Sequence, residues 1–225
     1  MDQLFEDRAD AGRRLARELR KMNLRDPVIL ALPGGGVSVA AAIARALRAP
    51  LDLLLVPKIG APGQPALAVN ADAEGVQPLL EACNEGLRPG GVLPDDMHSD
   101  LPLCLEEMER RRRLFLQGRP SPPVAGRTAV LVDDGIASGA TVRAALLSLR
   151  ARLPERTVLA VPVAPAAQVA RLRAKVDALV CLLTPEPFVA VAAYYRHFSQ
   201  TTDKQVEALL AAQARRTGAS ARANS

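Results

Sequence analysis

The chain has 225 residues, of which 49% are hydrophobic and only 3% aromatic, and its formal net charge is +5. This length is enough for one domain with a sizeable, mainly aliphatic core, and no apolar run is long enough to cross a membrane. The first residues, MDQLFEDRAD, are charged and lack a signal-peptide pattern, and the three cysteines have no metal-like spacing. We therefore expect a cytoplasmic protein with free thiols and no membrane partner.

The positive charge is densest at Arg110–Arg113, directly after Glu106, Glu107 and Glu109. Acidic residues that precede basic ones along a helix favour ion pairs within that helix. No aromatic residues alternate with the arginines, so nothing offers bases a stacking surface. The cluster indicates a solvated helix or an oligomer surface and argues against nucleic acid as a partner.

Hydrophobic periodicity predicts helices and strands in alternation. In chain order, the pattern predicts a helix at Leu4–Met22, a strand at Val28–Leu32, a helix at Val37–Leu47, a strand at Leu51–Ile59 with Lys58 near its end, a strand pair at Ala66–Ala71 and Val76–Leu79, and a helix at Asp100–Gln117. It then predicts strands at Thr128–Val132, Val158–Val163 and Ala178–Leu183, and helices at Val142–Arg152, Ala166–Lys175 and Asp203–Ala212.

This alternation predicts an α/β fold, a doubly wound and mostly parallel sheet with a five-stranded core and a small hairpin insertion. We expect one domain over residues 1–214, with 72–120 as an insertion and helix region that is mobile around 84–100. The polar tail, 215–225, is expected to be disordered. Ligands of such sheets bind beyond the carboxyl ends of the strands, where Pro33–Gly36, Lys58 and Asp133–Thr141 are predicted to meet.

The most informative stretch is Thr128–Ala145, which reads as a strand, two carboxylates, a small-residue loop and a helix. The N–H groups of the loop Gly135–Thr141 and of the following helix can bind a phosphate without a cationic side chain. Asp133 and Asp134 are placed to hold hydroxyls or a divalent cation. A site that binds a phosphate beside two neighbouring hydroxyls suits a ribose 5-phosphate. The alternative is an ordinary strand–turn–helix with an Asp cap.

The turn Pro33–Gly36 (PGGG) follows the first strand and raises the question of dinucleotide binding. The match to that fingerprint is poor, because the run GGGVSV lacks Gly or Ala at its last place. Asp52, the next acidic residue, begins the following strand instead of ending it. The turn therefore needs a different explanation.

The run VLVDDGIASGAT at 130–141 closely resembles the signature of type I phosphoribosyltransferases. The resemblance implies that Asp133 and Asp134 contact the ribose hydroxyls of phosphoribosyl pyrophosphate (PRPP). Relatives carry Arg or Lys in the glycine turn where this chain has Gly34, and Lys58 is a candidate to compensate as a third catalytic residue. The implied 5′-phosphate site is Ala137, Ser138, Gly139, Ala140 and Thr141, and the implied pyrophosphate site is Gly34, Gly35 and Gly36.

The resemblance extends over nearly the whole chain to a little-characterised bacterial branch of this family. Phe5–Ala16 (FEDRADAGRRLA) is similar to its F-x-D-R-x-x-A-G-R-x-L-A opening, and Lys58–Ala68 to its K-x-G-A-P-G-N-P-E-L-A segment. This chain departs from the branch's pattern at three positions, with Gln64 in place of Asn, Ala66 in place of Glu and Asn70 in place of Gly. Its C-terminal pattern is matched by Pro185, Phe188, Tyr195, Phe198, Gln200 and Asp203.

By resemblance, the chain is a PRPP-dependent glycosyltransferase (a pentosyltransferase) of nucleotide metabolism that releases pyrophosphate, and a homodimer. Mg²⁺ would be its cofactor, bound through ligand oxygens and water with no direct protein ligand. Ala137 stands where 6-oxopurine relatives carry Asp, which argues against hypoxanthine or guanine as the acceptor and leaves it unknown. Two alternatives stay open: a non-catalytic regulator that senses PRPP or a nucleotide, and a ribose-phosphate hydrolase or phosphorylase-like enzyme.

Overall fold

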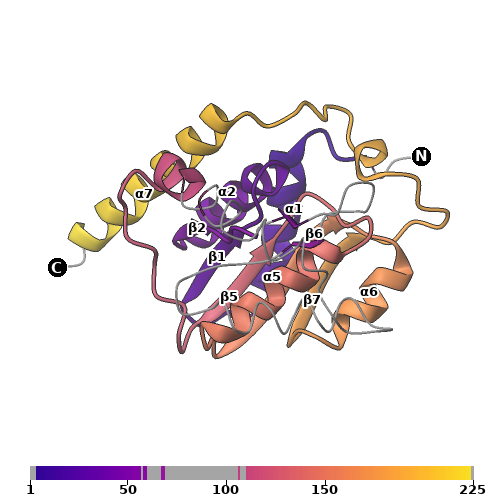
Figure 1. Cartoon of the computed structure of the whole chain (residues 1–225), viewed down its shortest axis with the longest axis horizontal. Coiled ribbons are helices and arrows are strands. Elements are labelled where there is room, and N and C mark those ends of the chain that lie inside the picture. Colours follow the sequence, from indigo (N-terminus) through magenta and orange to yellow (C-terminus); the bar gives the residue numbers. More distant parts are fainter. Residues whose placement is uncertain (1–3, 57, 60–66, 69–105, 107–109, 224–225) are drawn as a thin grey trace.

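The computed structural model describes residues 4–56, 58–59, 67–68, 106 and 110–223, without the side chains of 58–59, 67–68 and 218–223. A parallel sheet of five strands, in the order β2-β1-β5-β6-β7, forms its centre (Figure 1). This confirms the predicted doubly wound sheet. The strands are β1 (Pro27–Ala31), β2 (Leu51–Leu53), β5 (Thr128–Val132), β6 (Arg156–Val163) and β7 (Ala178–Leu183).

Helices cover both faces of the sheet. Because successive strand residues point to opposite faces, Ile29 and Val130 face one core cluster and Leu30 and Leu131 face the other. Each strand of the centre is therefore a continuous apolar run, as expected for a sheet buried on both sides. The first layer contains α1 (Arg8–Arg20), α2 (Gly35–Leu47) and α7 (Asp203–Ala223), and the second contains α5 (Ala140–Ala151) and α6 (Ala166–Arg173).

The helices α1 and α2 approach each other closely at Gly12. A Cβ on Gly12 would lie 2.7 Å from Ala42 Cβ and would also overlap the carbonyl oxygen of Val39. Only a residue without a side chain allows this approach. The contact fixes α1 along α2, which brings Arg8, the first residue of α1, to the start of α2.

The prediction that Lys58 ends a core strand is wrong. The second core strand stops at Leu53, and Lys58–Ile59 forms β3, which pairs antiparallel with β4 (Leu67–Ala68) in a separate two-stranded sheet. Pro57, which cannot donate to a strand ladder, stands between the two strands. The predicted partner strand 76–79 and the segment 84–100 lie outside the described residues.

The helices have different limits from those predicted; α1, for example, begins at Arg8 and not at Leu4. α2 begins at Gly35 and α5 at Ala140, so residues assigned to loops form first helical turns. α7 continues to Ala223, so residues 215–223 are helical where a disordered tail was expected. Alanine and arginine, frequent in this stretch, favour helix strongly enough to offset Gly218.

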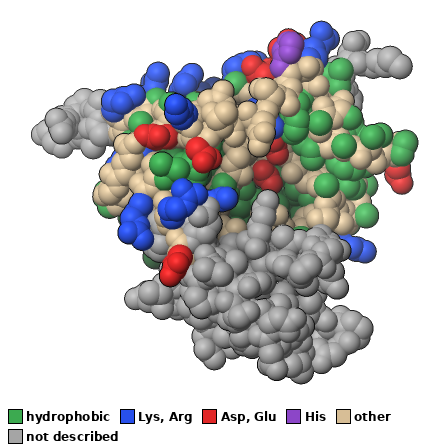
Figure 2. Space-filling view, turned by 45° about the horizontal axis from the view of Figure 1, so that its top comes forward, with side chains coloured by type: hydrophobic (Ala, Val, Ile, Leu, Met, Phe, Trp, Pro, Cys, Tyr) green, Lys and Arg blue, Asp and Glu red, His purple; other side chains and the backbone are tan. Residues whose placement is uncertain are grey.

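The described face in Figure 2 separates side chains by type. Most Lys and Arg lie on its left and upper parts and most apolar side chains on its right, while Asp and Glu are scattered over the face. On this face the positive charge thus forms several groups and no single basic stripe. Within the described residues, no helix is both long and apolar enough to cross a membrane.

Candidate functional site

The candidate site lies at the carboxyl ends of the neighbouring strands β1 and β5, which pair through Ala31 and Val132. The chain leaves β1 toward β2 on one side of the sheet and leaves β5 toward β6 on the other. This reversal of strand order is the switch point at which open α/β sheets bind ligands. The glycine turn follows β1, and the two carboxylates follow β5.

The glycine turn leads directly into α2. Gly34 is the N-cap residue, with φ +92° and ψ −130°, a backbone conformation that residues with a Cβ avoid. Gly35 and Gly36 form the first turn, where backbone N–H groups have no partner within the helix. The turn therefore presents N–H donors and the positive end of a helix dipole, which together suit an anion.

The turn and the carboxylates are in direct contact. A Cβ on Gly35 would lie 2.5 Å from Asp134 Cγ, and one on Gly36 would lie 3.1 Å from Asp133 Oδ1. Any side chain at Gly35 would displace the Asp134 carboxylate. The structure thus brings together two of the groups predicted from the sequence, although about a hundred residues separate them.

Asp133 and Asp134 have distinct environments. Asp133 Oδ1 accepts a hydrogen bond of 2.9 Å from the Asp134 backbone N–H. Burial, and next the negative charge of Asp134, raise the pKa of Asp133 well above its usual range, while the guanidinium of Arg8 acts in the opposite direction. Asp133 therefore holds a proton more readily than an exposed carboxylate would.

Arg8 is a site residue that the sequence reasoning did not identify. Its Nε donates to Asp134 Oδ2 at 2.8 Å and its Nη1 to the carbonyl oxygen of Ser199 at 2.6 Å. Its guanidinium carbon lies 3.9 Å from the centre of the Phe198 ring, and its side chain is only 11% exposed. The signal available in the sequence was the Arg of the F-x-D-R pattern.

A C-terminal segment, in which Tyr195 and Phe198 match the pattern of the family branch, supports the carboxylates. The hydroxyl of Tyr195 donates to the backbone carbonyl oxygen of Asp134 at 2.5 Å, and burial raises the pKa of this phenol. The Tyr195 ring packs between two other rings: its centre lies 5.3 Å from that of Phe5 and 5.1 Å from that of Phe198. A parallel bridge between Phe5 and Tyr195 joins the N-terminal and C-terminal segments beside the site.

The loop after the carboxylates ends in the first turn of α5. Gly139, the N-cap residue, has φ +74°, which favours glycine. Ala137 and Ser138 are exposed, and the Ser138 hydroxyl accepts a 3.4 Å hydrogen bond from the N–H of Ala140. Nη1 of Arg143, a second cation that the sequence reasoning did not identify, donates to the Ser138 carbonyl oxygen at 3.0 Å.

The predicted site residues therefore divide into two groups. The structure brings the glycine turn against the two carboxylates, and the loop that follows the carboxylates in the chain leads into the start of α5. The side chain of Lys58 lies outside the described residues, so its predicted role stays a prediction.

The site thus combines a glycine turn, paired carboxylates and a small-residue loop at the switch point of an α/β sheet, the place where such sheets bind ligands. Residues 1–196 match the model of the phosphoribosyl transferase domain family. The chain belongs to this family, which confirms the resemblance seen in the sequence.

Similar proteins agree with this assignment. The chain is 45% identical over 208 residues to Rv0571c and to MT0597 of two Mycobacterium tuberculosis strains, both provisionally named phosphoribosyl transferases. That match covers 92% of this chain but 46% of each relative, so the chain spans about half the length of these curated relatives. The solved structure of TT1426 from Thermus thermophilus is 39% identical, with a TM-score of 0.76 over 92% of this chain and 97% of that one.

Proposed function

We propose that the protein is a phosphoribosyltransferase that uses PRPP, transfers its phosphoribosyl group to an acceptor and releases pyrophosphate. One observation carries the proposal: Gly35 and Gly36 of the glycine turn lie directly against Asp134 and Asp133. A group bound at the turn and a ribose bound by the carboxylates would therefore be neighbours. The diphosphate and ribose of PRPP are neighbours in this way.

In this proposal the chain acts mainly by binding and orienting. The carboxylates of Asp133 and Asp134 accept hydrogen bonds from the ribose hydroxyls, and the N–H groups of Gly35 and Gly36 bind the diphosphate. Ala137–Thr141 bind the 5′-phosphate at the start of α5. Holding both ends of the substrate fixes the anomeric carbon, and donors aimed at the leaving group stabilise the charge that develops on it.

Mg²⁺ would reach the site with its substrate and be held mainly by substrate oxygens and water, since no group of three or more His, Cys, Asp or Glu able to hold a metal ion lies among the described residues. Magnesium prefers oxygen ligands and commonly binds through phosphates, with one or two carboxylates and water. Asp133 and Asp134 are the carboxylates nearest the turn, and Arg8 already pairs with Asp134. Bound magnesium would neutralise charge on the diphosphate.

The test is calorimetric titration with PRPP and Mg²⁺, followed by a pyrophosphate-release assay with pooled nucleobases as acceptors. Binding with release establishes the transferase. Binding without release, repeated with acceptors beyond nucleobases, favours the regulator. Cleavage without pyrophosphate release indicates the hydrolase or phosphorylase-like enzyme, and no binding overturns the proposal.

A further inference from the structure

Arg8 occupies a position that local helix energetics do not explain. It is the first residue of α1, so its positive charge lies at the positive end of the helix dipole. Its side chain is nevertheless mostly buried, and it is held by Asp134, Ser199 and Phe198. A cation that is fixed in a locally unfavourable place indicates a role in the site.

In this chain the glycine turn has no cationic side chain, because residues 34–36 are all glycine. Gly34 has open space around its Cα, but its φ of +92° is strained for an arginine or lysine. A side chain at Gly35 would collide with Asp134 and Arg8, and one at Gly36 would crowd Asp133. Positive charge for an anion at this turn must therefore come from another element.

We propose that Arg8 supplies this charge, contacting the anion that the turn Gly34–Gly36 binds. A Cβ on Gly35 would lie 2.5 Å from Arg8 Nε, so the guanidinium lies against the turn itself. The inference rests on the proposed function, because the anion it concerns is the diphosphate of PRPP.

The guanidinium has donors left for such a ligand. Nε and Nη1 bond to Asp134 and Ser199, while Nη2 makes no hydrogen bond with the described residues. Its charge also counters those of Asp133 and Asp134, which would otherwise repel a diphosphate. Arginine suits this task because its planar group binds phosphate oxygens with two donors at once.

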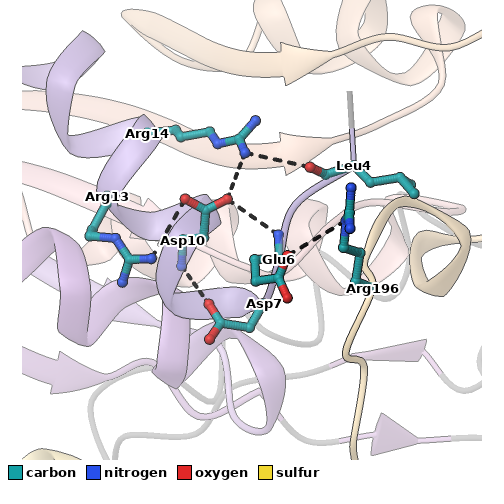
Figure 3. A network of polar contacts seen from close by, with 7 residues as sticks. All are labelled: Leu4, Glu6, Asp7, Asp10, Arg13, Arg14 and Arg196. Atoms are coloured by element: carbon teal, nitrogen blue, oxygen red, sulfur yellow. Dashed lines mark hydrogen bonds and ion pairs between the residues drawn. The ribbon is translucent and has the colours of Figure 1, made fainter. Parts of the chain in front are cut away.

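A polar network fixes the segment that carries Arg8 (Figure 3). Asp7 caps α1 by accepting a 2.6 Å hydrogen bond from the N–H of Asp10. The Asp10 carboxylate binds Arg14 at 2.8 Å and the N–H of Glu6 at 3.3 Å, and Glu6 pairs with Arg196 of the C-terminal segment. The network holds both segments that position the guanidinium, so little entropy is lost when Arg8 binds a ligand.

The experiment measures the affinities of inorganic pyrophosphate, PRPP and ribose 5-phosphate for the full chain and its variants. Arg8→Gln should weaken pyrophosphate and PRPP binding by at least about tenfold, the loss of one charge-assisted hydrogen bond, and ribose 5-phosphate binding by less than about twofold. Arg8→Lys, which keeps the charge but not the planar group, should lie between. The matched control is Arg127→Gln, whose guanidinium is also mostly buried and paired with an Asp but lies just before β5, at the end of the strand away from the site.

The double variant Arg8→Gln/Asp134→Asn separates direct contact from neutralisation of Asp134. It restores the net charge of the wild-type site and removes the unpaired carboxylate that would disturb folding. Direct contact predicts that its pyrophosphate affinity stays below that of the wild type. Full recovery would mean that Arg8 acts only through Asp134, which overturns the inference.

The remaining outcomes distinguish the two proposals. If the wild type binds PRPP, and Arg8→Gln leaves the affinity unchanged while Lys58→Met weakens it, the inference about Arg8 is overturned but the proposed function is not. Equal loss of all three ligands in a folded Arg8→Gln variant also overturns it. Wild-type binding of pyrophosphate but not of PRPP overturns the proposed function alone, and binding of neither overturns both.

Discussion

Replacing Gly35 by alanine tests whether the glycine turn and the carboxylates are in contact. At an ordinary position in a first helical turn, Gly→Ala would stabilise a protein by about 0.5–1 kcal/mol. Here the new Cβ would lie 2.5 Å from Asp134 Cγ and 2.5 Å from Arg8 Nε. Carbon atoms in contact are separated by about 3.5–4.0 Å, so the carboxylate must move by about 1 Å or more.

Such overpacking costs about 1–3 kcal/mol, and displacement of Asp134 also weakens its 2.8 Å ion pair with Arg8. We therefore expect Gly35→Ala to lower the free energy of unfolding by about 2 kcal/mol. Urea denaturation, read from the midpoint at an unchanged slope, measures this difference. Affinity for PRPP should fall in the same variant, because both the turn and Asp134 are disturbed.

Gly126→Ala is a stability-matched control. Gly126 has φ +68° with nothing within 4 Å of its Cβ position, so alanine there costs strain of about 1–2 kcal/mol without a collision. It lies just before β5, at the end of the strand away from the site. The control should lose stability but keep its affinity for PRPP. A Gly35→Ala variant as stable as the wild type would refute the contact.

Four further predictions follow from the same geometry. Asp133→Asn combined with Asp134→Asn should abolish PRPP binding in a chain that stays folded, and unchanged affinity would overturn the ribose assignment. Since the pKa of Asp133 is raised on folding, its contribution to stability is greatest below the unfolded value of about 3.9 and is lost as pH rises through the folded value. In the wild type the free energy of unfolding should therefore decrease as pH rises above about 4, and Asp133→Asn should make this decrease smaller. Identical profiles of unfolding free energy against pH in the wild type and the variant would contradict the raised pKa of Asp133. Tyr195→Phe keeps the ring packing but removes the bond to the Asp134 carbonyl, so it should cost about 1 kcal/mol in denaturant unfolding. Gly12→Ala should cost about 1–3 kcal/mol by forcing α1 from α2, and no loss would contradict the close approach.

Local chemistry allowed part of the site to be predicted from the sequence. The apolar run Thr128–Val132, the two carboxylates after it and the small-residue loop form one continuous stretch, in which neighbours in sequence are neighbours in space. The glycine turn was likewise predictable, because three successive glycines after a strand allow the positive φ of Gly34 and leave room for a neighbouring group at Gly35. The five core strands were predictable because a sheet buried on both faces requires continuous apolar runs.

Element limits were less predictable, because propensity and tertiary context compete at them. Lys58 reads as the end of a long apolar strand, yet the core strand stops at Leu53 and Lys58 enters a separate sheet. Residues 215–223 read as a polar tail, yet α7 continues through them. In α7 the buried Gln213 donates to the Ala49 carbonyl oxygen at 3.0 Å, a contact across the fold that the sequence does not indicate.

The sequence by itself thus determined the individual core strands, the acidic pair and the glycine turn, because each depends on residues close together in the chain. Only the tertiary structure decided what surrounds the acidic pair. Arg8 reaches Asp134 across 126 positions and Tyr195 reaches it across 61. Nothing local in either residue specifies that contact. It results from the packing of α1 on α2 and from the pairing of the N-terminal and C-terminal segments beside the sheet.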